Sequence, residues 1–150
     1  MKTGMKKALS LLLAIVMVMG LGVTALAADK ATVTVETAAA EAKPGDEVTL
    51  DVNIANNPGV AATGAFVDYD RDRLELVNII TSYTTTIEDE EVEVSYFGGS
   101  LAEINLDKKP AEYQVEKLGL DANKSYGFVT TANGKNVTKN GRMYKLVFKV

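Results

Sequence analysis

Alternation of apolar and polar side chains is the feature that most constrains how this chain can fold. In VTLDVNI (48–54), Thr, Asp and Asn alternate with four apolar residues: Val48, Leu50, Val52 and Ile54. A period of two places the two sets on opposite faces of a strand, so this segment predicts a half-buried β-strand. Six other segments are also predicted to be strands: 31–37, 60–70, 74–80, 91–97, 126–131 and 142–150.

Turn-forming residues separate these strands. Lys43-Pro-Gly-Asp46 and Asn56-Asn-Pro-Gly59 flank the strand at 48–54, and residues 131–141 are predicted to form a turn-rich loop. Residues 110–118 predict a short helix with Pro110 in its first turn. About seven short strands with almost no helix predict an all-β chain folded as a β-sandwich.

The same alternation predicts which side chains point into the sandwich. In segment 74–80, Leu74, Leu76 and Val77 are expected to point inward. In segment 142–150, the more apolar of the two alternating sets is expected to face the core: Arg142, Tyr144, Leu146, Phe148 and Val150.

The N-terminus has the features of a secretory signal peptide. Three lysines precede an apolar run at 8–23, and Ala25-Leu-Ala27 has the small-x-small pattern of a cleavage site. The alternative, an uncleaved anchor, is disfavoured because the run is short for a spanning helix of about 20 apolar residues. We therefore expect residues 1–27 to be removed, residues 28–150 to form the domain, and the product to be secreted without membrane insertion.

Charge and composition exclude several functions. The formal charge is −4, and removal of the three lysines in the predicted signal leaves 13 basic and 20 acidic residues, or −7. Such a chain repels nucleic acid phosphates. Without Cys or His it lacks thiol nucleophiles, the commonest general base and the usual zinc ligands. We therefore expect no enzyme activity, no metal site and no cofactor.

Three alternating aspartates, Asp68, Asp70 and Asp72, raise the question of a calcium site. A calcium loop of the EF-hand type needs Gly at position six and Glu at position twelve, but these positions are Arg73 and Ile79. Paired carboxylates for glycoside hydrolysis would need to share one pocket, and no second acidic pair supports that. The segment is predicted to be a turn, with Asp70 capping backbone N–H groups.

Three segments resemble, in order, parts of cohesin domains. Lys43-Pro-Gly-Asp-Glu-Val-Thr-Leu-Asp-Val52 resembles the opening "PGD-x-V-x-x-x-V". Asn57-Pro-Gly-Val60, Phe66-Val-Asp-Tyr-Asp70 and Leu74-Glu-Leu-Val77 resemble the run "G-I … YD … L-x-V". Residues 136–150 resemble the late strand "V-T-x-x-G-x-x-x-x-L-x-F-x-V". The resemblance covers the predicted mature chain except residues 82–123.

The resemblance implies a jelly-roll β-sandwich and a binding function. Cohesins are nine-stranded modules of scaffoldins that bind dockerin modules on enzymes or surface proteins and so assemble cellulosomes for polysaccharide breakdown. About seven of the nine strands have counterparts here, so the domain is expected to be C-terminally incomplete, and other domains could attach it to a cell surface. Calcium is expected on the dockerin.

The resemblance also implies a binding face on the strand at 60–70. Matching Tyr69-Asp70 to the family's "YD" points four residues outward, onto the dockerin-binding face: Ala62, Gly64, Phe66 and Asp68. Some cohesins carry Asn and Asp where this chain has Ala62 and Gly64, so those hydrogen bonds are missing. A slip of one residue exchanges the two faces, and this alternative places Phe66 in the core.

Two other functions remain open from the sequence. A carbohydrate-binding module would show a row of exposed rings, for which the candidates are Tyr83, Tyr96, Tyr113, Tyr126 and Tyr144. A surface spacer or adhesin domain would have no dedicated ligand. Fold alone does not decide between these and a dockerin-binding module.

Overall fold

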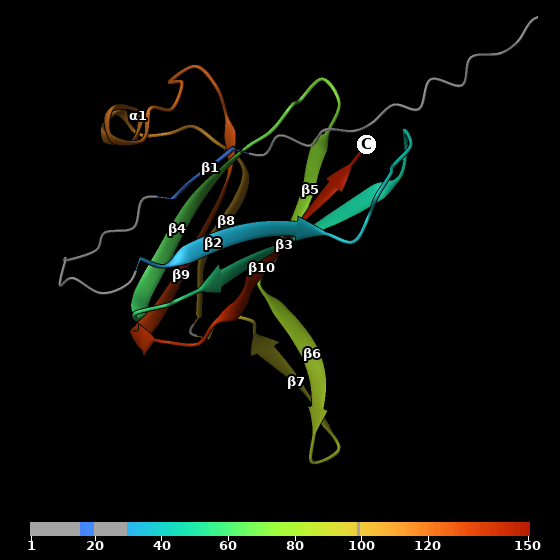
Figure 1. Ribbon diagram of the computed structural model, residues 1–150, viewed down its shortest axis with the longest axis vertical. Helices are drawn as coiled ribbons and strands as arrows, with labels where there is room; N and C mark the ends of the chain where they lie inside the picture. Colours follow the sequence, from blue (N-terminus) through green and yellow to red (C-terminus); the bar gives the residue numbers. More distant parts are fainter. Residues whose placement is uncertain (1–15, 20–29, 99) are drawn as a thin grey trace, which may run out of the picture.

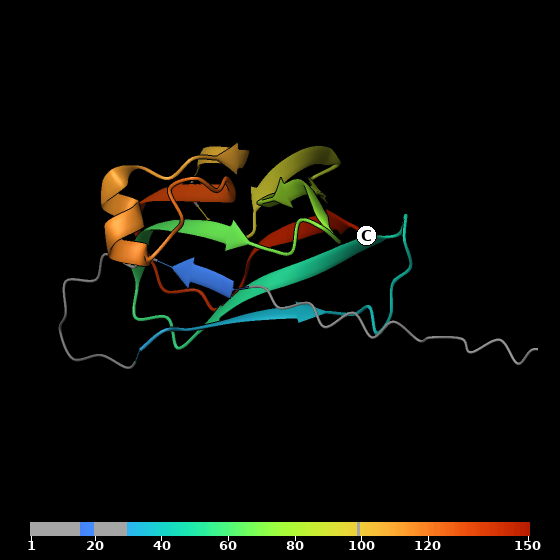
Figure 2. The same cartoon turned by 90° about the horizontal axis from the view of Figure 1, so that it is seen from above.

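The alternating segments form the strands of two antiparallel sheets that pack face to face (Figures 1 and 2). The computed structural model describes residues 16–19, 30–98 and 100–150. One sheet has the order β1-β4-β9-β8 and the other β2-β3-β10-β5, while β6 and β7 form a separate hairpin. The predicted all-β sandwich is therefore confirmed.

The elements have the following bounds: β1 (Val16–Met19), β2 (Thr32–Thr37), β3 (Glu47–Ala55), β4 (Val60–Asp68), β5 (Glu75–Ile80), β6 (Ser82–Ile87), β7 (Glu90–Ser95), β8 (Ser100–Lys108), α1 (Glu112–Leu118), β9 (Tyr126–Val137) and β10 (Gly141–Lys149).

The core lies between the two sheets and is built from the predicted apolar faces. All four inward residues of β3 are at most 4% exposed. Tyr144, Leu146 and Phe148 of β10 are at most 1% exposed, and β4 contributes Ala65 and Val67 from the opposite sheet. Burial of a large apolar side chain contributes about 1.5–3 kcal/mol. These residues therefore supply most of the driving force for sheet packing.

Two inward positions differ from the prediction. In β5, Leu76 and Ile79 are buried while Val77 is only half-buried and lies outside the core. In β10, the register with β3 shifts between Arg142 and Tyr144. This irregularity places Met143 in the core and turns Arg142 toward Asp51 on the solvent side of β3, because one extra residue exchanges the faces of a strand.

Besides β1, which lies in the predicted signal peptide, two strands were missed and one was predicted too short. The strand β6 lacks an alternating pattern because most of its side chains are exposed, and β8 lies in the segment without a clear pattern. The strand β9 continues to Val137, through the loop predicted at 131–141, because its backbone pairs with β4 as far as Val60. Backbone pairing requires no apolar side chains, so turn-forming residues did not end this strand.

The predicted helix at 110–118 is confirmed as α1. Its first turn is capped by the side chain of Gln114, whose Oε1 accepts a hydrogen bond of 2.8 Å from the backbone N–H of Ala111. Its end is marked by Gly119 in the left-handed conformation, with φ of 67°. Pro110 precedes the helix rather than opening it.

The short strand β1 falls within the predicted signal peptide. Its four residues pair antiparallel with β4, from Val16 opposite Asp68 to Met19 opposite Ala65. The remaining residues of the predicted signal lie outside the described residues. Cleavage after Ala27 would remove β1 and leave β4 at the edge of its sheet. Among the described helices, none has the length and apolar character needed to cross a bilayer.

The tight contact at Gly127 tests the packing of the two sheets. A Cβ atom at this position would lie 2.3 Å from Leu76 Cδ2 and 3.3 Å from Val67 Cβ, both in the core. We expect Gly127→Ala to lower the free energy of unfolding by about 1–3 kcal/mol, measured by urea denaturation. Gly64→Ala is the matched control, since its Cβ would meet only Thr130 Cγ2 at 3.5 Å. Equal stability of the two variants would contradict this packing.

Candidate functional site

The strand β4 has the register that its sequence predicts. Ala65 and Val67 are 2% and 0% exposed in the core, and Tyr69 packs against the core with its ring centroid 5.2 Å from that of Phe148. Since strand side chains alternate, the predicted set Ala62, Gly64, Phe66 and Asp68 lies on the outer face of the sheet. The alternative register, with Phe66 in the sandwich core, is therefore wrong.

Phe66 lies on the outer side of β4 but is not exposed. It is 3% exposed and forms a second apolar cluster with Leu120, Tyr126 and Phe128, against which Leu118 packs. Its ring centroid lies 4.6 Å from that of Phe128. The chain that follows α1 thus covers the half of the outer face that contains Phe66 and Phe128 (Figure 2). Although Phe66 points outward as expected for the binding face, it is not exposed to a partner, because residues distant in sequence fold over it.

Asp68 holds the covering segment in place. Its carboxylate lies 2.5 Å from Lys124 Nζ and 3.2 Å from Arg71 Nη1. Burial raises the pKa of this carboxyl, but the hydrogen bonds and positive charges of Lys124 and Arg71 lower the pKa further, so the net pKa lies below its ordinary value. Arg71 also donates to the carbonyl of Ser125. Asp68 therefore connects the end of β4 to the loop before β9.

The other two aspartates form the predicted turn. The side chain of Asp70 accepts a hydrogen bond of 3.1 Å from the backbone N–H of Asp72, which confirms its capping role. The carbonyl of Asp70 accepts a bond of 2.9 Å from the N–H of Leu74, the residue before β5. Within the described part of the chain, no group of three acidic side chains is placed to hold a metal ion.

The other half of the outer face presents small side chains that are exposed or half-buried. Ala62 pairs with Ala132, and Gly64 pairs with Thr130, so the four residues lie side by side on β4 and β9. Ala62 and Ala132 are exposed, while Gly64 and Thr130 are half-buried. We call these four residues the open face. Their small side chains would let the backbone of a partner approach closely.

A neutralised pair borders the open face. Glu103 of β8 lies beside Thr130 and forms an ion pair of 2.6 Å with Lys108. The Lys108 ammonium also lies 4.0 Å from the centre of the Phe128 ring, in the second apolar cluster. The four residues of the open face are therefore uncharged, and the carboxylate of Glu103 beside them is compensated by Lys108.

Sequence reasoning missed the residues that complete this surface. Leu118 and Leu120 lie within the segment 82–123 that could not be matched to cohesins, and Lys124 directly follows it, although the two leucines flanking Gly119 carried an apolar signal. Ala132 fell in the predicted loop, and its position became clear only from the pairing of β9 with β4.

The five candidate tyrosines do not form a row. Tyr126 and Tyr144 are buried, at 2% and 1% exposure, and burial raises the pKa of the Tyr144 hydroxyl. Tyr113 is 62% exposed on α1. Tyr83 and Tyr96 alone lie together, with ring centroids 5.2 Å apart.

Comparison of the chain with protein-family models, with curated proteins and with solved structures finds no match. The resemblance to cohesins thus rests on the three segments quoted above and remains a prediction.

The Asp68 pairs predict a pH dependence of stability. A carboxyl whose pKa is below its ordinary value of 3.8 in the folded state stabilises the fold above that value, and the contribution disappears as the pH falls through the folded pKa. We expect Asp68→Asn to lower the free energy of unfolding at pH 7 by about 1 kcal/mol or less, since the pairs are partly exposed and screened.

The difference between Asp68→Asn and the wild type should narrow below about pH 4, as followed by urea denaturation across pH. Asp72→Asn is the control, because Asp72 forms no ion pair among the described residues. A difference that stays constant from neutral to strongly acidic pH would contradict a stabilising role of the ionised carboxylate.

Proposed function

We propose that this protein is a non-catalytic, cohesin-like module that binds a dockerin through the open face. The three cohesin-like segments support the proposal because they form connected parts of one sandwich. The first forms the turn at 43–46 and most of β3, the second spans β4 and the start of β5, and the third includes β10. Segments scattered over unrelated elements would have given no such support.

The open face is the observation that carries the proposal. Cores of protein interfaces are depleted in charged residues, and Ala62, Gly64, Thr130 and Ala132 are all uncharged and small. The outer face of the other sheet differs, because it carries charged residues: Lys145 lies opposite Asp51 in the strand register, and Lys149 lies between Glu47 and Glu75. The contrast favours the β4–β9 side as the partner-binding surface.

The proposal assigns each component a role. The predicted signal would export the chain, and the module would hold dockerin-bearing enzymes or surface proteins on an extracellular scaffold for polysaccharide breakdown. Calcium would enter with the dockerin, whose loops resemble EF-hands. Phe66 would act indirectly, because its packing against Leu120 and Phe128 holds the segment after α1 beside the contact surface.

A substitution on the open face tests the proposal. The protein isolated after export would be titrated calorimetrically with dockerin modules of the same organism, with and without calcium. We expect Gly64→Arg to weaken binding by about tenfold or more, since a large charged side chain prevents close approach. Calcium removal should abolish binding by unfolding the dockerin loops.

Thr49→Arg is the matched control for this titration, because Thr49 is an exposed residue on the outer face of β3. It should leave the affinity unchanged. Failure to bind any dockerin in either condition would contradict the function. An equal loss in both variants would instead contradict the assignment to the open face.

A further inference from the structure

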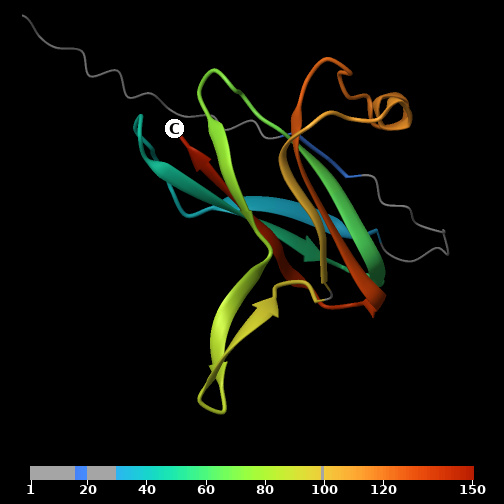
Figure 3. The same cartoon turned by 180° about the vertical axis from the view of Figure 1, so that it is seen from behind.

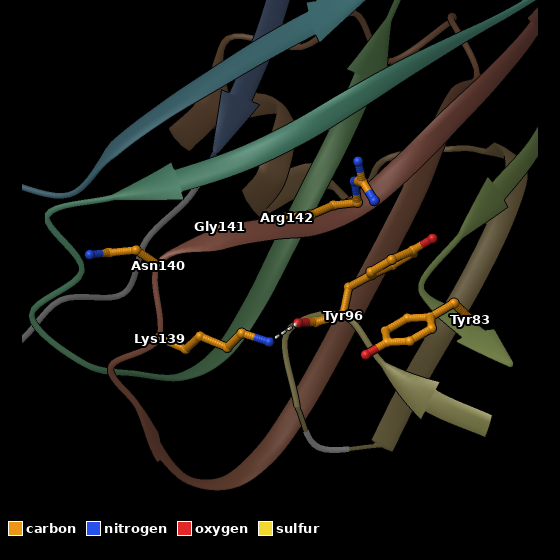
Figure 4. A pocket seen from close by; sticks show the side chains of 6 residues that line it. All are labelled: Tyr83, Tyr96, Lys139, Asn140, Gly141 and Arg142. Carbon is orange, nitrogen blue, oxygen red and sulfur yellow. Dashed lines mark hydrogen bonds between the residues drawn. The ribbon is translucent and has the colours of Figure 1, made fainter. Parts of the chain in front are cut away.

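A second surface, built on other residues than the open face, has the features of a ligand site. The β6–β7 hairpin projects away from the sandwich (Figures 1 and 3), and an open groove of about 440 Å³ lies at its base. Six residues line the groove: Tyr83, Tyr96, Lys139, Asn140, Gly141 and Arg142 (Figure 4). Its volume falls within the range of about 300–1,000 Å³ that is usual for small-molecule sites.

The fold holds the two tyrosines in place. Phe97 is 1% exposed in the core, so the preceding Tyr96 points away from the core. The N–H of Tyr96 donates a bond of 2.9 Å to the carbonyl of Thr81, which continues the hairpin ladder and makes Tyr83 its diagonal neighbour on the same face. The two rings are tilted by 31° and together form an aromatic surface, with Tyr83 43% exposed.

Positive charges surround this aromatic surface. The Arg142 guanidinium lies 5.1 Å from the Tyr96 ring centre and is held by its ion pair with Asp51. Lys139 donates a bond of 3.4 Å to the carbonyl of Tyr96, and the Lys145 ammonium lies 6.0 Å from the same ring. Among the described residues, neither lysine forms an ion pair. The lining of the groove thus holds two cationic side chains and no carboxylate, although Asp51 balances the charge of Arg142 and the hairpin itself carries Glu90, Glu91 and Glu93.

We propose that this groove binds a carboxylate-bearing sugar, such as a uronic acid residue of an acidic polysaccharide. The C–H bonds on one face of a sugar ring pack against the negative face of an aromatic ring, which Tyr83 offers to solvent. The carboxylate would pair with Lys139, which lines the groove, and with Lys145 beside the Tyr96 ring, and the two ammonium groups also offer donors to hydroxyl groups. This function goes beyond dockerin binding and uses different strands.

The test compares an acidic polymer with a neutral one. Affinity electrophoresis of the exported protein in gels containing polygalacturonate should show retardation that decreases with salt, since charge pairing is screened. Gels containing the neutral polymer hydroxyethylcellulose should show little retardation. We expect Tyr83→Ala and Lys139→Gln each to weaken retention by about fivefold or more. Both side chains belong to partly or fully exposed residues, so the variants should fold, which circular dichroism would verify.

The helix α1 supplies matched controls. Tyr113 and Lys117 are an exposed aromatic residue and an exposed cation one turn apart, outside the groove. Tyr113→Ala and Lys117→Gln should retain full binding. Absence of retardation, or retardation unaffected by Tyr83→Ala and Lys139→Gln, would overturn the proposal. Equally strong binding to polyglutamate through the same two residues would also overturn it, in favour of an acidic peptide ligand.

Discussion

Burial of one face of β10 is the constraint on which the rest of the structure depends. This strand lies between β3 and β5, and its residues Tyr144, Leu146 and Phe148 pack against Ala65 and Val67 of the opposite sheet. Because strand side chains alternate, burial of this set directs the lysines of β10 to solvent and the even-numbered residues of β4 to the other outer face. The chemical character of both outer surfaces therefore follows from the packing of one core.

The two outer surfaces then acquire different properties. On the β4–β9 side, aromatic residues collect at one end and are covered by the chain after α1, while small side chains remain open at the other end. On the β3–β10 side, Arg142 forms an ion pair with Asp51 across the strands, and the shifted register at Arg142 brings its guanidinium to the base of the hairpin. The proposed protein-binding surface and the proposed sugar-binding groove therefore share no residue. Binding of a dockerin and binding of a sugar can be tested independently.

The sequence predicts those parts of the fold in which alternation coincides with burial. The strand β3, most of β10 and the helix α1 follow from pattern alone, while the register of β4 was predicted from the match of Tyr69-Asp70 to the cohesin "YD". Pattern could not predict β6, because its side chains are mostly exposed. Nor could it predict that Arg142 points toward solvent, because this depends on the register shift between β10 and β3 at Arg142 and Tyr144. The burial of Phe66 on the outer face could not be predicted either, because Leu120 approaches it only through tertiary folding.

The central claim is that the open face, and not the opposite sheet, contacts the protein partner. Amide chemical shifts of the isotopically labelled protein, followed by NMR during titration with a calcium-loaded dockerin, test this most directly. The account predicts that the largest changes fall on Ala62, Gly64, Thr130 and Ala132 and that β3 changes little. Changes centred on β3 and β10, with β4 unaffected, would contradict it.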